Sequence, residues 1–343
     1  MENIANFFII AVGTILALIY GQSILIQLII AFLLWFATLQ LKKTACKLKC
    51  FSRLIPAQVQ SLVILGLLLF VGYIVLNAVM ENLSDLITSF SSYEESITAI
   101  ANTAERVFHL DLQSEIASMI SSLDIQNILS QLANGLSSIF SNSMMILIYL
   151  LFLFLESDSV KLKINALFPE PAARQKMLST LEKIESSLSG YFLVKTMMSL
   201  LTALLSFMVL YVIGVDSPLF WAFLIFTLNY IPTIGSLVAT VFPAVFSLLQ
   251  FGRFTPFIKI VLLIGAIQQV IGNFIEPRLM GKNLNISPMV TIIALAVWGK
   301  IWGIMGMLLS VPITVTIIIV LSQFKATHKA AIVLSEKGEL STG

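Results

Sequence analysis

Long apolar runs alternate with short hydrophilic stretches along this chain. A membrane-spanning helix needs about 20 apolar residues, and six unbroken runs approach or reach that length. These runs are residues 4–20, 23–39, 57–80, 139–155, 191–213 and 256–276. The pattern predicts an all-α, polytopic membrane protein with about six transmembrane helices.

Two further apolar runs, 220–250 and 288–320, are interrupted near their middles by Gly and Pro. The first breaks at Pro232, and the second breaks around Gly303, Gly306 and Pro312. Unwound backbone persists inside a membrane only where protein buries it or where it lines a cavity. Paired interruptions of this kind indicate a transport pathway, so we expect each run to form a re-entrant helical hairpin.

The charges between the runs predict the orientation of the chain. Residues 40–53 hold five basic residues and no acidic one, which places them in the cytoplasm by the positive-inside bias. Residues 81–138 then lie outside; they hold eight acidic residues against Arg106 alone and have the spacing of amphipathic helices. Residues 156–190 return to the cytoplasm, where we expect two surface helices joined at Pro169–Pro171.

The number of membrane crossings after residue 213 limits how the two interrupted runs can be placed. Run 191–213 ends outside, whereas Lys325 and Lys329 place the C-terminal tail inside, so an odd number of crossings lies between them. Two hairpins with 256–276 as the single crossing satisfy this count and produce an inverted repeat of span and hairpin. Three full crossings satisfy it equally, but the half-segments are short for spans. Both chain termini are predicted to be cytoplasmic.

Composition narrows the function classes. Of 343 residues, 58% are apolar and 11% are charged, and the mean hydropathy is +0.98, values that belong in a bilayer. A net charge of +2 without basic tracts between aromatics gives no indication of nucleic-acid binding. Cys46 and Cys50 are expected as free thiols in a reducing compartment. His109 and His328 are isolated and no phosphate-binding loop occurs, so we expect no metal, no cofactor and no enzyme.

We expect five regions along the chain. They are N-terminal transmembrane helices serving as a scaffold (1–80), an extracytoplasmic amphipathic helical insert (81–138), a transmembrane helix with cytoplasmic helices (139–190), a transport unit with both broken segments (191–322) and a cytoplasmic tail (323–343).

Polar residues at membrane depth are the candidate site. On a regular helix through 256–276, one face would carry Gly265, Gln269, Gly272, Asn273 and Glu276. This face either lines the substrate path, with Glu276 as a proton carrier, or joins neighbouring helices through small residues and amide hydrogen bonds. In the second interpretation Arg278 neutralises Glu276 at the interface.

Lys195, Ser199, Thr202 and Ser206 share one face of the run 191–213. The hydroxyl groups either contact a polar solute or bond to carbonyls of their own helix. Lys195 lies about one turn from the interface, where a long side chain can reach the aqueous phase.

The break in the first interrupted run is the third candidate. A hairpin tip at this break would expose backbone groups and a side-chain amide, which could replace the hydration shell of a hydroxylated solute or a small cation. The residues concerned are Asn229, Pro232, Thr233 and Gly235. The alternative is that Pro232 only kinks one helix, with Asn229 and Thr233 satisfying the freed carbonyls.

Three blocks carry a family resemblance: "LNYIPTIGSLVATVFPAV", "GNFIEPRLMGKNLNISPMV" and "WGIMGMLLSVPITV". With the order of spans and loops from about residue 4 to 322, they resemble the autoinducer-2 exporter (AI-2E) family of bacterial membrane proteins. The resemblance implies an inner-membrane permease for small solutes that assembles as a homo-oligomer, a pentamer in particular. Some members are credited with exporting the quorum-sensing signal autoinducer-2, and others with exchanging sodium for protons.

The chain departs from the family pattern at several positions. Val194 and Lys195 stand where relatives often have a small residue and Gln, and Phe226 and Thr227 replace small residues. The fold of a transporter does not fix which solute it carries; individual side chains in the pathway do. The sequence therefore predicts an exporter of a small polar solute such as autoinducer-2, with pathway residues that include Gly303 and Gly306. The alternatives are a sodium/proton antiporter, coupled to H⁺ or Na⁺ through Glu276, and a non-transporting membrane scaffold.

Overall fold

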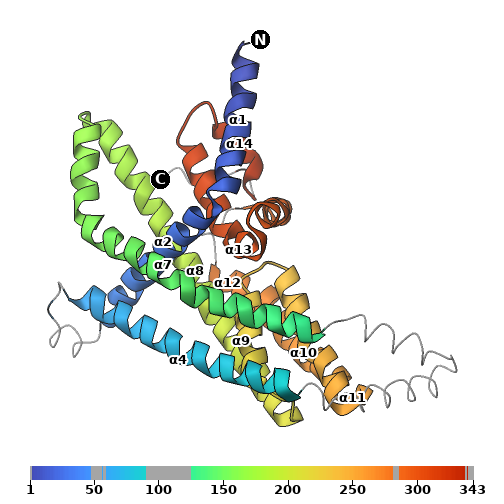
Figure 1. The fold of residues 1–343 in the computed structure, drawn as a ribbon. Coiled ribbons are helices and arrows are strands. Elements are labelled where there is room, and N and C mark those ends of the chain that lie inside the picture. Colours follow the sequence, from blue (N-terminus) through green and yellow to red (C-terminus); the bar gives the residue numbers. More distant parts are fainter. Residues whose placement is uncertain are drawn as a thin grey trace. The chain divides into compact units, whose positions relative to one another are not determined.

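The computed structural model describes residues 2–47, 56, 59–89, 125–280, 286–336 and 338. Every regular element in these ranges is helical, as the apolar runs predict (Figure 1). Most of the acidic insert, residues 90–124, lies outside the described residues, and so do Cys50 and Arg53.

The N-terminal helices follow the predicted runs closely. They are α1 (Glu2–Tyr20), α2 (Gln22–Ala45) and α4 (Gln60–Ser89). Gly21 separates the first two helices, and Lys42 and Lys43 occupy the last turn of α2. Cations are favourable there because the helix dipole is negative at its C-terminus.

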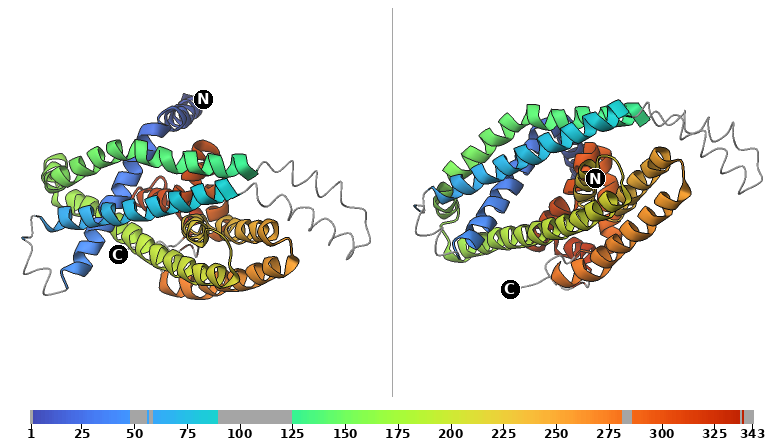
Figure 2. Two further views of the ribbon diagram at one scale, coloured as in Figure 1. Left: turned by 60° about the horizontal axis from the view of Figure 1, so that its bottom comes forward. Right: turned by 90° about the horizontal axis from the view of Figure 1, so that it is seen from below.

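The next two helices are longer than predicted. The structure contains α7 (Ile125–Leu167) and α8 (Pro171–Ile213), each an unbroken 43-residue helix (Figure 2). At 1.5 Å per residue each measures about 65 Å, roughly twice the thickness of the hydrocarbon core. Both polar segments are thus helical and meet where the prolines predict, but each is continuous with the helix of its span and is not an element of its own. Their place at the cytoplasmic surface stays a prediction. The polar segments contain no helix breaker, so each continues the helix of its span.

The first interrupted run forms two helices, α9 (Pro218–Leu228) and α10 (Ile234–Phe251), which pack against each other. The chain continues into α11 (Phe254–Val270), a π-helical turn η2 (Ile271–Ile275) and α12 (Glu276–Met280). Helix α10 also packs along α11.

The second interrupted run folds back on itself within α13 (Pro288–Ser322). Trp302 and Gly303 have non-helical backbone angles, whereas Pro312, which was expected to contribute to the break, lies inside the helix. The indole Nε1 of Trp298 donates to Oγ1 of Thr314 at 3.3 Å. A straight helix would separate residues 16 apart by about 24 Å. The two halves of α13 therefore form a helical hairpin, which a short helix, α14 (His328–Leu334), follows.

The chain forms two compact units. One comprises residues 1–66, 142–193 and 280–343, and the other comprises residues 67–141 and 194–279. The core of the second unit draws on α4, α8, α9, α10 and α11, and its fully buried side chains include Leu83, Leu210, Phe220, Ile225 and Ile264. The first unit has smaller clusters around Leu150 and around Val311. These units are defined by packing, so the functional division predicted from the sequence stays a prediction.

Six helices in the described residues are long and apolar enough to cross a membrane: 22–45, 60–89, 171–213, 234–251, 254–280 and 288–322. This set differs from the predicted spans, because it includes part of the first interrupted run and all of the second, and omits 4–20 and 139–155. The protein is a multi-pass membrane protein. Re-entrance of the hairpins and the inverted repeat stay predictions.

Candidate functional site: a buried polar row in an apolar unit

A buried ion pair joins α8 to the start of α12. The ammonium Nζ of Lys195 lies 2.6 Å from Oε1 of Glu276, and the two side chains are only 9% and 12% exposed. Lys195 therefore does not reach toward water, and Glu276 pairs with Lys195 and not with Arg278, which is exposed. A buried charge is stable only with such a partner, because desolvation of a lone ion is costly.

The π-helical turn η2 sets the direction of Glu276. It lies directly before Glu276 and replaces regular α-helical spacing over five residues. A π-turn accommodates about one extra residue, which rotates everything that follows around the helix axis. Gln269 and Asn273 hydrogen-bond to each other on an exposed surface of the chain, whereas Glu276, which follows the π-turn, is turned inward. The single polar face predicted for this run is not kept.

The predicted amide and the buried amide are neighbours on α11, where successive side chains point about 100° apart. Gln268, which the sequence analysis did not select, is buried, while the neighbouring Gln269 is exposed. The available sequence signal was the position of Gln268 one turn after Ile264 and two turns after Ile260, on an otherwise apolar stripe.

On α8, the predicted polar face is buried throughout. Lys195, Ser199, Thr202 and Ser206 are all inaccessible, while most of their neighbours on α8 are exposed apolar residues. Thr202 donates to the carbonyl of Met198 in its own helix, as the local-bonding interpretation predicts. Ser199 instead accepts from Nδ2 of Asn229 at 3.1 Å. This row is the polar interior of the second unit.

The tip between α9 and α10 is a tight, strained turn. Thr233 has φ 59° and ψ −58°, and the Ile234 amide donates to the Pro232 carbonyl at 2.6 Å, which defines a γ-turn with positive φ. A β-branched residue rarely adopts this conformation. A Cβ on Gly235 would lie 1.8 Å from the Leu228 carbonyl oxygen, so only glycine fits. The interpretation of one kinked helix is therefore wrong.

Two hydrogen bonds fasten this tip to α8. Besides the bond from Asn229 to Ser199, the hydroxyl groups of Tyr230 and Thr196 lie 2.7 Å apart. The Asn229 amide is thus directed into the polar row and does not satisfy the backbone of the break.

The tip within α13 has the same two features, a residue with positive φ and a tightly packed glycine. Gly303 has φ 60°, and a Cβ on Gly306 would lie 1.9 Å from the Trp298 carbonyl oxygen. The rings of Trp298 and Trp302 lie 5.2 Å apart, and Nε1 of Trp302 donates to the Leu18 carbonyl of α1 at 2.9 Å. Both interruptions therefore depend on a glycine packed against a carbonyl of the preceding helix.

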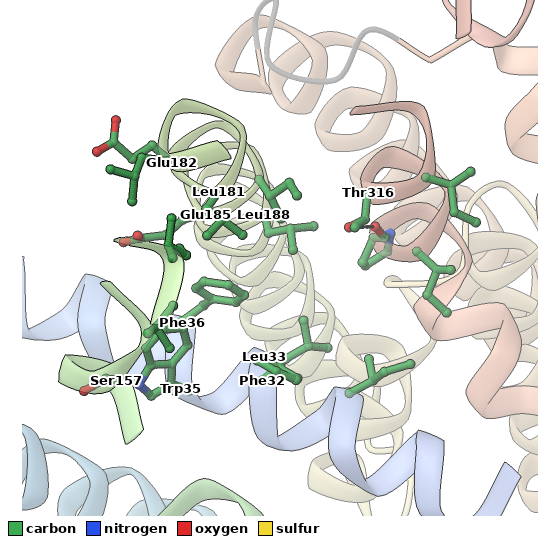
Figure 3. Close-up of a pocket in the computed structure, with 18 residues that line it drawn as sticks. Phe32, Leu33, Trp35, Phe36, Ser157, Leu181, Glu182, Glu185, Leu188 and Thr316 are labelled. Carbon is green, nitrogen blue, oxygen red and sulfur yellow. Dashed lines mark hydrogen bonds between the residues drawn. The ribbon is translucent and has the colours of Figure 1, made fainter. Parts of the chain in front are cut away.

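A separate cavity of about 550 Å³ lies in the first unit. Side chains of α2, α7, α8 and α13 line it, including Phe32, Leu33, Phe36 and Leu188 (Figure 3). The carboxylates of Glu182 and Glu185 lie at one edge, and Glu185 pairs with Lys43 at 3.2 Å. Its lining is almost wholly apolar and includes none of the predicted pathway residues, so the polar row is the better site for a polar solute.

Comparison with known proteins agrees with this architecture. Residues 8–326 match the family described as "AI-2E family transporter". The chain is 34% identical over 212 residues to the "AI-2 transport protein TqsA" of Escherichia coli, a match that covers 62% of this chain and 59% of that protein. It is 37% identical over 183 residues to a putative transport protein of Borreliella burgdorferi, covering 52% and 49% of the two chains.

A third relative is the putative transport protein YhhT of Escherichia coli, which is 30% identical over 255 residues, or 73% of this chain and 72% of that protein. The matches to the first two relatives thus span less than two thirds of their lengths, whereas the family match extends over nearly the whole chain. This chain belongs to the AI-2E family of transporters.

Proposed function

We propose that this protein is a secondary transporter that exports a small polar solute across the inner membrane. The observation that carries the proposal is the buried row Lys195, Ser199, Thr202 and Ser206 on a helix that can cross the bilayer. Polar and ionisable groups at membrane depth are costly and mark solute or ion pathways. Asn229 and Glu276 approach this row from two other helical segments.

Autoinducer-2 is the proposed solute. The support is the similarity to the Escherichia coli protein named an AI-2 transport protein, together with amide and hydroxyl groups suited to a hydroxylated molecule. The proposed pathway residues are Asn229, Pro232, Thr233, Gly235, Gln269, Asn273, Gly303 and Gly306. We further propose cytoplasmic termini, two re-entrant hairpins and a homo-oligomer in which the N-terminal spans form the scaffold.

A sodium/proton antiporter is the second candidate, and the buried Glu276 favours it. A carboxylate in a membrane protein can bind a proton or a sodium ion if its cationic partner moves away. In that mechanism the ion pair with Lys195 would open and close during each cycle, and Glu276 would be indispensable.

The test is efflux from proteoliposomes that hold the full chain and are loaded with autoinducer-2, or with a pH-sensitive dye under a sodium gradient. For the exporter we expect Asn229→Ala to abolish release of autoinducer-2, because it removes the amide from the polar row. Sodium-driven proton movement that disappears in Glu276→Gln would instead establish the antiporter. Glu182→Gln is the matched control, because Glu182 is exposed and lies outside the row. No movement of either cargo would contradict both candidates.

A further inference from the structure

Three buried side chains in the second unit have hydrogen-bonding atoms without a partner among the described residues. They are Ser206 through Oγ, Gln268 through both amide atoms, Oε1 and Nε2, and Trp221 through Nε1. Ser206 is 0% exposed and Gln268 is 8% exposed. Native proteins satisfy nearly all buried polar groups, so four such atoms in one unit require an explanation.

Ser206 lies on α8 and Gln268 lies on α11, two helices that contribute side chains to the same hydrophobic core. At one end, Leu210 shares a hydrophobic cluster with Ile260 and Ile264. At the other end, Lys195 of α8 pairs with Glu276. Late residues of one helix therefore meet early residues of the other, which makes the two helices antiparallel.

Ser206 and Gln268 occupy matching places between these two contacts. Ser206 lies one turn from Leu210, and Gln268 lies one turn from Ile264, each in the direction of the ion pair. Residues four apart share a helix face. Counted from the ion pair, Ser206 is 11 positions from Lys195 and Gln268 is 8 positions from Glu276, so the two side chains lie within about one helical turn of the same level. Thr202 and Ser199 continue the polar row on α8.

The chemistry of these groups selects a class of ligand. An amide offers a donor and an acceptor, and a hydroxyl group offers both as well. The nearest charges that the structure shows along the row, Lys195 and Glu276, neutralise each other. A cation would find no uncompensated carboxylate here and would face the donor Nε2, so an uncharged partner with hydroxyl or carbonyl groups fits better.

We propose that Ser206 and Gln268 form a binding site for an uncharged, hydroxyl-bearing part of the transported solute. The inference rests on the proposed transport function and adds two residues to it. Before the solute enters, buried water can occupy the same positions, because such polar sites hold water that makes two to four hydrogen bonds.

The binding test uses the purified full chain in lipid nanodiscs. The thermal midpoint is measured with autoinducer-2, with ribose as a second uncharged polyol, and with sodium chloride against potassium chloride. We expect an uncharged probe to raise the midpoint of the wild type but not of Gln268→Met, which has similar volume and no amide. A shift by sodium that depends on Gln268, or no shift by either uncharged probe, would overturn the site.

The transport test measures KM for autoinducer-2 efflux. Loss of one neutral hydrogen bond corresponds to about tenfold in affinity, so KM should rise about tenfold in Gln268→Met and severalfold in Ser206→Ala. Ser189→Ala, on the same helix with only a local bond to Ser186, is the matched control. Unchanged KM in both variants overturns the site while the wild type still transports. If the wild type shows no efflux but still binds a probe in a way that depends on Gln268, the proposed transport function is wrong and the binding site stands.

Discussion

Lys195 and Glu276, 81 positions apart in the sequence, form a buried ion pair with Nζ and Oε1 2.6 Å apart. The pair joins α8 to the point where η2 passes into α12. It fixes the level at which the two helices meet and closes one end of the polar row.

Removing one partner of this pair should destabilise the protein strongly. We expect Lys195→Met to lower the free energy of unfolding by about 3–5 kcal/mol, because the carboxylate of Glu276 then stays buried without an opposite charge. Glu276→Gln should lower it somewhat less, because the neutral glutamine can still accept a hydrogen bond from Lys195. Thermal unfolding of the purified chain in nanodiscs measures the loss.

The double variant Lys195→Met/Glu276→Met separates stability from transport. It should recover most of the stability, since no buried charge remains, while an antiporter would stay inactive. Lys43→Gln is the control, because the pair of Lys43 with Glu185 is partly exposed and should contribute about 0–1 kcal/mol. If Lys43→Gln lost as much stability as Lys195→Met, the pair of Lys195 with Glu276 would not be the buried, strongly coupled one.

The two interruptions should tolerate no side chain at their packed glycines. Gly235→Ala and Gly306→Ala would place a Cβ within 2 Å of a carbonyl oxygen, so each hairpin must open or shift. We expect a lower yield of folded protein and loss of efflux. Gly265→Ala and Gly272→Ala are the controls, since nothing lies within 4 Å of an added Cβ at either position. Equal behaviour of the two groups in size-exclusion chromatography would refute the tight turns.

The γ-turn at Thr233 should store strain that glycine relieves. With φ at 59° and ψ at −58°, the threonine backbone lies in a sparsely populated region that costs about 1–3 kcal/mol. Thr233→Gly is therefore expected to raise the thermal midpoint, whereas Thr233→Ala, which keeps a Cβ, should not. The order of the three midpoints is the measurement, and a lower midpoint for the glycine variant than for the alanine variant would argue against strain.

The fold-back of α13 should be visible by cross-linking. In a background with Cys46→Ala and Cys50→Ala, the pair Trp298→Cys/Thr314→Cys should react with a short bifunctional thiol reagent, because the native side chains touch. Met177→Cys/Leu193→Cys has the same sequence separation on the unbroken α8 and should not react, since about 24 Å separates its ends. Intramolecular cross-links are counted by mass spectrometry. The opposite result would mean that α13 is straight.

The sequence by itself determined the helical class, the positions of the apolar helices along the chain and the places of the two interruptions. These features are local: apolar run length, the absence of helix breakers, and Gly and Pro at Pro232, Gly303 and Gly306 control backbone conformation within a few residues. The buried face of α8 was also predictable, because four polar residues at helical spacing in an apolar run point to one side.

The tertiary structure alone decided which polar groups meet. A regular period of 3.6 residues put Gln269 and Glu276 on one face, but the π-turn between them rotates the chain, so that Glu276 is turned inward while Gln269 is exposed. Lys195, which could have reached the interface from its position on α8, is held inside by a carboxylate on another helix. Such choices depend on packing between helices far apart in sequence, and no local pattern encodes the partner that compensates a buried charge.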